Sequence, residues 1–306
     1  MSRTDLVTGA YGYTGTYLRR RLERSGHTVR TLTDHPAPDA EIEVFPYAFD
    51  DPGALDAAFE GVTTFYNTYW TRYAPGGTTH HQAVRNTEAM LASAARMGVE
   101  RVVHLSITNP DAASFYAYYR GKARVEDLVT GCGLSHAIVR PSVIFGGNDI
   151  LLNNIAWLLR RFPVFAIPGN GRYRLRPVYV EDLADLCVRL GEEKADMVID
   201  AVGPEAFGFE ELAGTIAEAV GVAFRPVHLP VAAVSMVVRV LSLLTRDVVL
   251  TRDELDGLMA ELVMVEGEPT CPTPLTAYLR ENAGRFGRDY RSELARREPV
   301  RIPALT

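Results

Sequence analysis

Short apolar runs alternate with amphipathic segments through the first half of this chain. The runs are rich in β-branched and aromatic residues, which predicts buried strands, and the segments between them have helical periodicity. A first strand is expected from residue 4 into a group of glycines, and further strands at 27–33, 41–45, 62–67, 101–107 and 136–140. Helices are expected between them at 16–25, 52–60, 80–97 and 116–130. This alternation predicts an α/β fold with a doubly wound parallel sheet, in which the carboxyl ends of the strands share one edge.

The second half of the chain is less regular. Helices are expected at 153–161 and from 178 onward, a strand at 197–201, and a mainly helical pattern after 209 with a join at 226–230. Residues 163–176 are punctuated by Pro and Gly, which indicates an irregular excursion. We therefore predict a dinucleotide-binding domain over 1–150, to which 178–205 return, and a smaller, mainly helical substrate lobe formed by 151–177 and 206–306.

Three glycines at three-residue spacing follow the first strand, in the segment Thr8-Gly9-Ala10-Tyr11-Gly12-Tyr13-Thr14-Gly15. The first glycine allows a tight turn, the second lets main-chain N–H groups approach a pyrophosphate, and the third lets the next helix pack on the strand. The N-terminus of that helix directs its unsatisfied N–H groups at the anion. Because a strand precedes the glycines and a helix and a second strand follow them, the pattern predicts a Rossmann-type dinucleotide site.

The residue after the second strand bears on the choice of dinucleotide. Asp34 stands there, and a carboxylate at this point accepts hydrogen bonds from ribose hydroxyls and repels a 2′-phosphate. The cofactor expected is therefore NAD. Arg30 and His35 lie nearby in the sequence and keep NADP possible.

A tyrosine and a lysine are spaced four residues apart in the helix expected at 116–130. Tyr118 and Lys122 would share one face of that helix, so that both can meet one ligand. A phenol is a poor acid–base group at neutral pH, and a nearby ammonium lowers its pKa by favouring the phenolate. The alternative is a tyrosine at the edge of the core with a lysine on a solvated face.

Composition and charge narrow the class of protein. With 306 residues and a formal net charge of −6, the chain is large enough for two domains and shows no basic excess that would indicate nucleic acid as a partner. The first strand leaves no room for a signal peptide, and the three cysteines lie far apart, so a reducing, cytoplasmic location is expected. The adjacent His80 and His81 diverge on a helix, and no metal site is predicted.

An apolar stripe near the C-terminal half has two interpretations. Residues 231–244 are too short to span a bilayer and include Arg239. The stripe is interpreted as core or subunit interface, with a membrane-surface patch as the less favoured alternative, and no membrane partner is expected. The oligomeric state stays open.

Together these motifs resemble the short-chain dehydrogenase/reductase superfamily in its extended and atypical branches. The residues that carry the resemblance are the glycine turn, Asn86-Thr87, Tyr118-x-x-x-Lys122, Arg140-Pro141-Ser142-Val143-Ile144-Phe145-Gly146 and Val178-Tyr179-Val180-Glu181-Asp182-Leu183-Ala184. They cover roughly residues 4–205. The chain looks most like the NAD-dependent epimerase/dehydratase-type oxidoreductases related to NmrA-like proteins.

The resemblance implies a role for each matching residue. Tyr118 is implied as the general acid/base, and Lys122 as the partner that lowers its pKa and anchors the nicotinamide ribose. The residues implied to bind the cofactor are Gly9, Gly12, Tyr13, Thr14 and Gly15 at the pyrophosphate, Asn67 and Thr68 at the riboses, and Pro141, Ser142 and Val143 at the carboxamide. The family's carbonyl-polarising Ser or Thr falls on Ile107. Because strand alternation places Ser106 and Thr108 on the same face, either is expected to take that role.

Three functions follow from this interpretation. The first is an NAD(P)-dependent oxidoreductase that moves a hydride between nicotinamide and a carbonyl/alcohol pair on a small organic substrate. The second is an epimerase or dehydratase that retains its NAD, and the third is a non-catalytic NmrA-like dinucleotide sensor. The aromatic residues between Phe65 and Tyr73 either wall a substrate pocket or pack beneath a loop.

Overall fold

The computed structural model describes residues 3–37, 40–72 and 78–297, which fall into two compact units. The first unit holds the described residues up to Pro141 together with Leu183–Asp200, and the second holds Ser142–Asp182 and Ala201–Arg296. Within residues 3–296 the chain therefore changes unit after Pro141, Asp182 and Asp200, whereas the division predicted from sequence places these changes after 150, 177 and 205. The reason lies in two short strands, β7 (Ile144–Phe145) and β10 (Val178–Tyr179), which pair with each other outside the main sheet.

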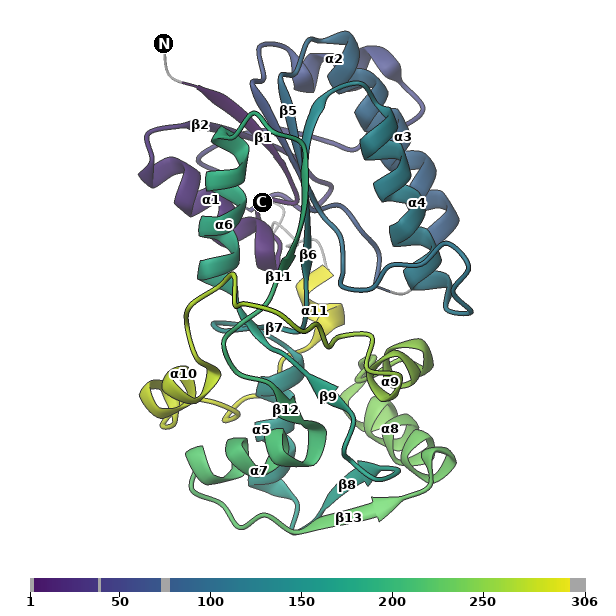
Figure 1. Ribbon diagram of the computed structural model, residues 1–306, viewed down its shortest axis with the longest axis vertical. Coiled ribbons are helices and arrows are strands. Elements are labelled where there is room, and N and C mark those ends of the chain that lie inside the picture. Colours follow the sequence, from purple (N-terminus) through teal and green to yellow (C-terminus); the bar gives the residue numbers. More distant parts are fainter. Residues whose placement is uncertain (1–2, 38–39, 73–77, 298–306) are drawn as a thin grey trace, which may run out of the picture. The chain divides into compact units, whose positions relative to one another are not determined.

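The first unit is built on a parallel sheet (Figure 1). Within the described residues this sheet has seven strands, in the order β11 (Met197–Ala201), β6 (Ser135–Pro141), β5 (Arg101–Leu105), β4 (Thr64–Asn67), β1 (Thr4–Thr8), β2 (Thr28–Leu32) and β3 (Glu43–Phe45). The strand order reverses between β1 and β4, because the chain proceeds from β1 to β3 in one direction and from β4 onward in the other. This is the switch point at which doubly wound sheets bind their ligands.

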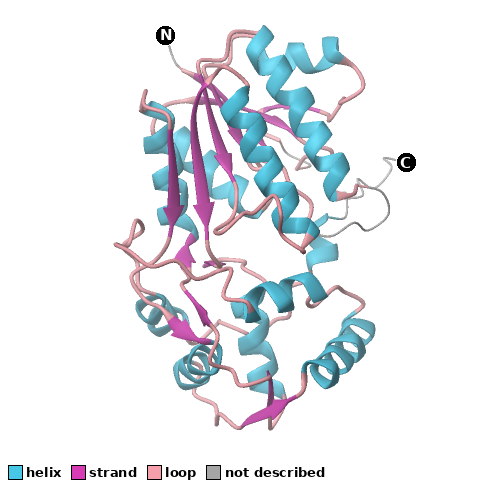
Figure 2. Ribbon diagram, turned by 45° about the vertical axis from the view of Figure 1, so that its right-hand side comes forward, coloured by secondary structure: helices cyan, strands magenta, loops and turns pink. Residues whose placement is uncertain are grey.

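Helices cover both faces of this sheet. Figures 1 and 2 show α2 (Pro52–Phe59), α3 (His80–Arg96) and α4 (Ala117–Gly131) on one face, and α1 (Tyr13–Arg24) and α6 (Val180–Glu192) on the other. An ion pair between Arg21 and Asp185, 2.5 Å apart, links α1 to α6. On the opposite face, Leu6, Phe65 and Val102 of the sheet are fully buried against apolar side chains of α2, α3 and α4.

The second unit has its own core. Apolar residues of α5 (Leu151–Arg161) and α7 (Phe209–Ala219) are buried together in it, with aromatic side chains from the surrounding strands and loops. The other elements are β8 (Phe165–Pro168), β9 (Arg174–Leu175), β12 (Phe207–Gly208), β13 (Pro226–Leu229), α8 (Val231–Thr245), α9 (Arg252–Met259), α10 (Leu275–Asn282) and α11 (Glu293–Arg297). The predicted α/β fold with a smaller, mainly helical C-terminal part is confirmed.

The structure agrees with most of the predicted elements and changes a few. The helix expected at 52–60 begins at Pro52, and Asp51 caps it, because its carboxylate accepts the N–H groups of Gly53 and Ala54 at 3.0 and 3.1 Å. The helix expected to start at 16 begins at Tyr13. The expectation that residues 226–230 form only a join is wrong, because β13 pairs in parallel with β8. That partner lies in the Pro/Gly-punctuated excursion, where only irregular structure was expected, and long-range pairing of this kind leaves no local signal.

Hydropathy of the helices bears on membrane insertion. Throughout the described ranges, no helix combines the length and the apolar character that a bilayer crossing requires.

Candidate active site

The glycine turn after β1 brings the main chain of two elements into contact. Gly9 has φ +63° and donates its N–H to the carbonyl of Leu32 at 2.9 Å, and Gly12 donates to the carbonyl of Gly9 at 2.8 Å. A Cβ added to Gly15 would lie 2.1 Å from the Gly9 carbonyl oxygen, closer than any real contact. The helix α1 can therefore pack against the turn only with glycine at this position.

The N-terminus of α1 has the features of an anion site. Its N-cap is Gly12, which offers no side-chain cap to the first N–H groups, and its first turn, which contains Tyr13 and Thr14, has no acidic residue. The N–H groups at a helix start then depend on another partner, and an anion there is favoured by the helix dipole. The turn and the helix start fit a pyrophosphate.

A row of polar side chains marks the carboxyl ends of three neighbouring strands. Leu6, Phe65 and Val102 are in register across β1, β4 and β5 and belong to the apolar core. Two residues further along each strand, on the same face, stand Thr8, Asn67 and His104, all fully buried. The face thus changes from apolar to polar along one line, at the edge where a cofactor would bind.

Hydrogen bonds in this row tie the loop after β4 to the end of β1. Thr68 donates its N–H to Thr8 Oγ1 at 2.7 Å and its hydroxyl to the Thr8 carbonyl at 2.5 Å. Asn67 Oδ1 accepts the N–H of Tyr69 at 3.0 Å. Asn67 and Thr68 therefore lie beside the glycine turn, where the resemblance implies contact with the riboses. Their side chains also have a structural task, because they hold the loop in place.

His104 is a polar residue that sequence reasoning missed. Because the Asn67 oxygen is used by Tyr69, the Asn67 amide donates to His104 Nδ1, 3.2 Å away, and the His104 proton then resides on Nε2. Burial and the nearby Lys122 hold the pKa of His104 well below its usual value, so the ring is neutral. Its Nε2 has no hydrogen-bond partner among the described residues. The only available signal was a histidine two residues before Ser106 in the strand expected at 101–107.

Tyr118 and Lys122 of α4 both contact the ring of Trp70, which belongs to the loop after β4. Lys122 Nζ lies 4.8 Å from the centre of the Trp70 ring, and Tyr118 meets that ring edge-on at 5.8 Å. The two side chains therefore share one face of α4. His80 stacks on Trp70 with the ring centres 5.5 Å apart. A Cβ on Gly121 would lie 2.6 Å from Trp70 Cη2, so glycine there makes room for the indole.

The ammonium of Lys122 is buried. Only 3% of the residue is exposed, and Nζ donates to the carbonyl of Leu105, the last residue of β5, at 2.8 Å. Burial lowers the pKa of Lys122 to about 7, against a smaller opposing effect of Glu126 one turn further along α4. Glu126 itself is held by Arg140 of β6 through two bonds of 3.0 and 2.6 Å. This arrangement brings the ammonium to the carboxyl end of β5.

The two candidates for carbonyl polarisation differ in their surroundings. Ser106 is buried, its N–H donates to the Val139 carbonyl at 2.8 Å, and its Oγ has no hydrogen-bond partner in the part of the chain that is described. Thr108 is fully buried and donates its N–H to the Pro141 carbonyl at 3.2 Å. A buried hydroxyl without a partner costs free energy, which favours a ligand or water at Ser106.

Asp34 stands exposed at the end of β2, where its Oδ1 accepts the N–H of Tyr47 at 3.0 Å. Arg30 lies within β2 instead, where it pairs with Glu43 at 2.6 Å and donates to the Glu60 carbonyl at 2.6 Å. Its guanidinium is thus engaged by partners other than a nucleotide. His35 is exposed beside Asp34, with its N–H bound to Thr33 Oγ1.

The remaining predicted residues fall in several places. Pro141 ends β6 and is buried, whereas Ser142 and Val143 belong to the second unit, where Ser142 Oγ donates to the Val263 carbonyl at 2.5 Å. His81 is hydrogen-bonded to Arg85. Within residues 3–37, 40–72 and 78–297, no group of three or more His, Cys, Asp or Glu side chains is placed to hold a metal ion.

The aromatic residues expected to form one cluster are divided among several environments. Phe65 packs edge-on against Phe59 in the core, and Tyr69 packs on Tyr47 while accepting a hydrogen bond from Asn86 at 2.7 Å. Tyr73 lies outside the described residues. Of the aromatic residues of this segment that are described, Trp70 is the one that contacts Tyr118 and Lys122.

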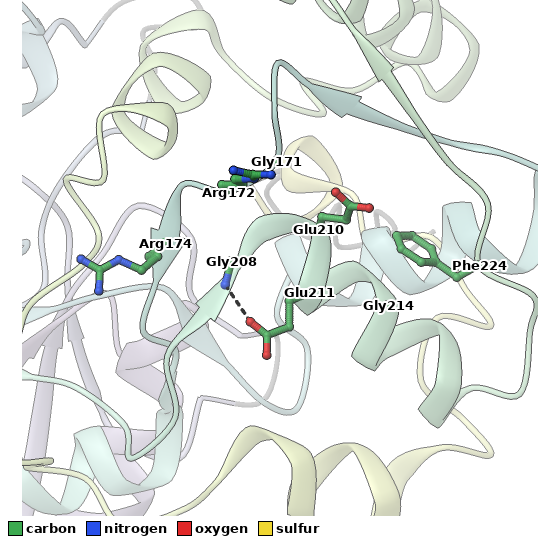
Figure 3. A pocket seen from close by; sticks show the side chains of 8 residues that line it. All are labelled: Gly171, Arg172, Arg174, Gly208, Glu210, Glu211, Gly214 and Phe224. Carbon is green, nitrogen blue, oxygen red and sulfur yellow. Dashed lines mark hydrogen bonds between the residues drawn. The ribbon is translucent and has the colours of Figure 1, made fainter.

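The second unit has a cavity of about 640 Å³, drawn in Figure 3. It lies at the N-terminus of α7 and is lined by Gly171, Arg172, Arg174, Gly208, Glu210, Glu211, Gly214 and Phe224. Glu211 caps this helix by accepting the Gly208 N–H at 3.1 Å, and Arg174 pairs with Glu261 and Glu266. Because carboxylates already occupy the helix end, the cavity does not have the character of a second phosphate site.

Comparison with known proteins identifies the family. The model of the NAD dependent epimerase/dehydratase family matches residues 6–200, well over half of the chain. The chain belongs to this family. The match includes the glycine turn, the polar row and α4, and family membership confirms both the resemblance inferred from sequence and the expected NAD cofactor.

Sequence similarity to a curated relative of this epimerase/dehydratase family member extends over about two thirds of the chain. The chain is 26% identical to the mitochondrial NADH dehydrogenase [ubiquinone] 1 alpha subcomplex subunit 9 of Arabidopsis thaliana, over 68% of this chain and 55% of that subunit. The chain spans only about half the length of this subunit.

Solved structures show the same fold. The NADPH-dependent quinone oxidoreductase QOR2 of Escherichia coli, complexed with NADPH, matches with a TM-score of 0.75 and 18% identity, over 92% of this chain and 98% of that one. MoeE5 in complex with UDP-glucose and NAD matches with a TM-score of 0.63 and 19% identity, over 74% and 85%. At such low sequence identities the similarity establishes the fold, whereas the reaction depends on the residues of the site.

Proposed function

We propose that this protein is an NAD(P)-dependent oxidoreductase that moves a hydride between nicotinamide and the carbonyl or alcohol of a small organic substrate. The observation that carries the proposal is the position of Lys122, a buried ammonium that shares the Trp70 ring with Tyr118 at the carboxyl end of β5. Burying an ammonium is costly, and a strongly perturbed lysine beside a phenol is typical of a functional site.

The glycine turn and the start of α1 would hold the cofactor. Gly9, Gly12, Tyr13, Thr14 and Gly15 would surround its pyrophosphate, and Asp34 would accept hydrogen bonds from the adenosine ribose. Asn67 and Thr68 would border the riboses, with Pro141, Ser142 and Val143 at the carboxamide, as the family resemblance implies. A nicotinamide cofactor, when bound, supplies or accepts a hydride.

The proton chemistry belongs to α4. Tyr118 would donate its phenolic proton to the substrate oxygen during reduction, and would accept it back during oxidation. A charged Lys122 would favour the phenolate form of Tyr118. The Ser106 hydroxyl, or that of Thr108, would donate a hydrogen bond to the same oxygen as negative charge develops. The unpartnered Ser106 Oγ favours Ser106 for this role.

The direct test is a fluorescence titration with NADH and with NADPH, followed by turnover of a panel of aldehydes and ketones. Tight binding of NADH with oxidation by at least one carbonyl compound is the expected result. Binding without turnover of any panel member would favour the dinucleotide sensor. Failure to bind either nucleotide, in protein purified without a bound one, would contradict the proposal.

Asp34 is expected to decide between the two dinucleotides. Replacing Asp34 by Asn removes the charge that binds ribose hydroxyls and repels a 2′-phosphate, so the Kd for NADH should rise about tenfold or more while that for NADPH falls. Asp50→Asn removes an exposed carboxylate from the turn before α2 and serves as the matched control. Unchanged Kd values for both nucleotides in Asp34→Asn would place the ribose elsewhere.

Lys122 should make the stability of the nucleotide-free protein depend on pH. Its pKa is about 7 in the folded chain against 10.5 for a free lysine, so between these values the unfolded chain holds a proton that the folded chain has lost. The free energy of unfolding therefore rises with pH in this window, by at most about 1.4 kcal/mol per pH unit. Below pH 7 both states carry the charge and the contribution is flat.

The variant Lys122→Met tests this prediction, because the contribution of Lys122 to the pH dependence of the free energy of unfolding is absent from it. Urea unfolding of wild type and variant between pH 7.5 and 9.5, a range of about two pH units inside the window, should show that wild type gains stability relative to the variant as the pH rises. Lys194→Met, at an exposed lysine, is the control and should keep the wild-type slope. A constant difference between wild type and Lys122→Met would mean that Lys122 stays charged throughout.

A second candidate is an epimerase or dehydratase that keeps its NAD. The family match and the likeness to MoeE5, a protein solved with UDP-glucose and NAD, favour this reading. Such an enzyme would regenerate its cofactor and should purify with it bound. Release of NAD on denaturing freshly purified protein, without net NADH oxidation by carbonyl compounds, would support it over the first candidate.

The cytoplasmic location also remains a proposal. It is supported by Cys132, Cys187 and Cys271, all free thiols in the structure.

A further inference from the structure

The helix α8 (Val231–Thr245) is apolar on both of its sides. Figure 1 shows it beside β8 in the second unit. Val234, on its inner side, is buried. Its outer side presents large apolar side chains at the helical spacing of one continuous stripe, with exposed fractions of 61% for Met236, 40% for Val237, 48% for Val240, 78% for Leu243 and 75% for Leu244.

This exposed stripe needs a partner. Single apolar side chains on a surface are ordinary, whereas a contiguous group of them marks an interaction site. A helix that is hydrophobic all round is normally covered on both sides. The second unit covers only the inner side of α8, so the outer side remains exposed and can bind a partner.

The charges around α8 indicate what that surface is. Residues 219–246 contain no Asp or Glu, although the whole chain has a net charge of −6. The same segment carries Arg225, Arg239 and Arg246, all exposed. A helix with an aliphatic outer side, whose charged residues are all cationic, matches an anionic bilayer surface, into which apolar side chains insert while arginine stems keep their charge at the headgroups.

A second copy of the chain fits this stripe less well. Arg239 lies next to Val240, the middle of the exposed run from Met236 to Leu244. If two α8 helices packed about a two-fold axis at the centre of that run, two arginines would meet near the axis, and α8 has no acid to pair with them. The stripe also lacks the Trp and Tyr that anchor protein interfaces.

We propose that α8 docks this protein on the surface of anionic lipid bilayers. This goes beyond the proposed oxidoreductase function and replaces the expectation that no membrane partner exists. The helix lies in the second unit, apart in sequence from the residues assigned to the dinucleotide and to catalysis, so docking and nucleotide binding are separable.

The test is co-sedimentation of the full chain with phosphatidylcholine vesicles, with and without phosphatidylserine. Binding to the anionic vesicles, weaker binding to phosphatidylcholine alone, and loss at high salt are expected. The double variant Leu243→Glu/Leu244→Glu should lose at least about tenfold in vesicle affinity while its NADH Kd is unchanged. Val198→Glu, at a half-exposed apolar residue of β11, is the matched control and should bind as wild type does.

A second variant tests the charge. Arg239→Gln/Arg246→Gln should remove the preference for phosphatidylserine without removing the apolar stripe. Failure of wild type to bind either vesicle, or equal binding to both that the arginine variant leaves unchanged, would overturn the proposal. A wild-type dimer in light scattering that Leu243→Glu/Leu244→Glu converts to monomer would also overturn it and assign the stripe to a second copy. Since NADH binding is measured separately, none of these results depends on the oxidoreductase assignment.

Discussion

Replacing Tyr118 by Phe is expected to lower kcat for carbonyl reduction by a factor of about 10² to 10⁴, while the Kd for NADH changes little. The substitution removes one oxygen atom and keeps the ring that packs edge-on against Trp70 and His80. The proton donor is lost, and general acid catalysis contributes this order of magnitude to rates. Cofactor affinity is kept because the glycine turn and Asp34 are untouched.

The same helix provides the control for this substitution. Tyr116 is the N-cap residue of α4 and is also partly buried, but it lies half a turn away from Tyr118. Tyr116→Phe should keep wild-type turnover. Steady-state assays of NADH oxidation, paired with NADH titrations, separate rate from binding. Unchanged turnover in Tyr118→Phe would refute its assignment as the acid.

Replacing Gly15 by Ala is expected to raise the Kd for NADH by about two orders of magnitude and to destabilise the fold. The new Cβ would lie 2.1 Å from the Gly9 carbonyl oxygen and 3.1 Å from the Ala10 Cα. Both contacts are with main chain, so α1 must move away from the turn, and overpacking of this kind costs about 1–3 kcal/mol. The pyrophosphate site is built from those same two segments, and small misplacements are costly there.

Gly131, at the C-terminal end of α4, is the matched control. Nothing lies within 4 Å of a Cβ added there, and Gly131→Ala should leave both stability and NADH binding near wild type. Thermal unfolding gives the stability of each variant, and far-ultraviolet circular dichroism confirms that Gly15→Ala still folds at the temperature of the titration. NADH binding by folded Gly15→Ala with wild-type affinity would show that the turn does not hold the dinucleotide.

The alternation of strands and helices in the first unit was predictable because its signals are local. The strands of a parallel sheet are buried on both faces and read as short apolar runs, and the helices between them have caps such as Asp51. The second unit shows the opposite case. β13 and β8 pair across a long stretch of chain, and short runs such as 226–229 have no periodicity that distinguishes a strand from a turn.

The candidate site was predictable in part. The spacing of Tyr118 and Lys122 already places them on one helix face. The third contact of that face, the Trp70 ring, depends on the loop after β4 folding back on α4 and on Gly121 leaving room for it. Neither the position of this loop nor the space for the indole at Gly121 can be inferred from the spacing of residues in the sequence. His104 was missed for a related reason, since a histidine in an apolar strand acquires its polar partners only from the neighbouring strand.

By itself, the sequence determined the fold class, the glycine turn, the carboxylate of Asp34 and the pairing of Tyr118 with Lys122. These features depend on residue type and on spacing within one element, which backbone geometry converts directly into position. Only the tertiary structure decided that the Lys122 ammonium is buried, that Arg30 is occupied by Glu43, and that the outer side of α8 is left exposed. Burial, ion pairing and exposure are set by segments distant in sequence, because the solvation of a side chain depends on everything that packs around it.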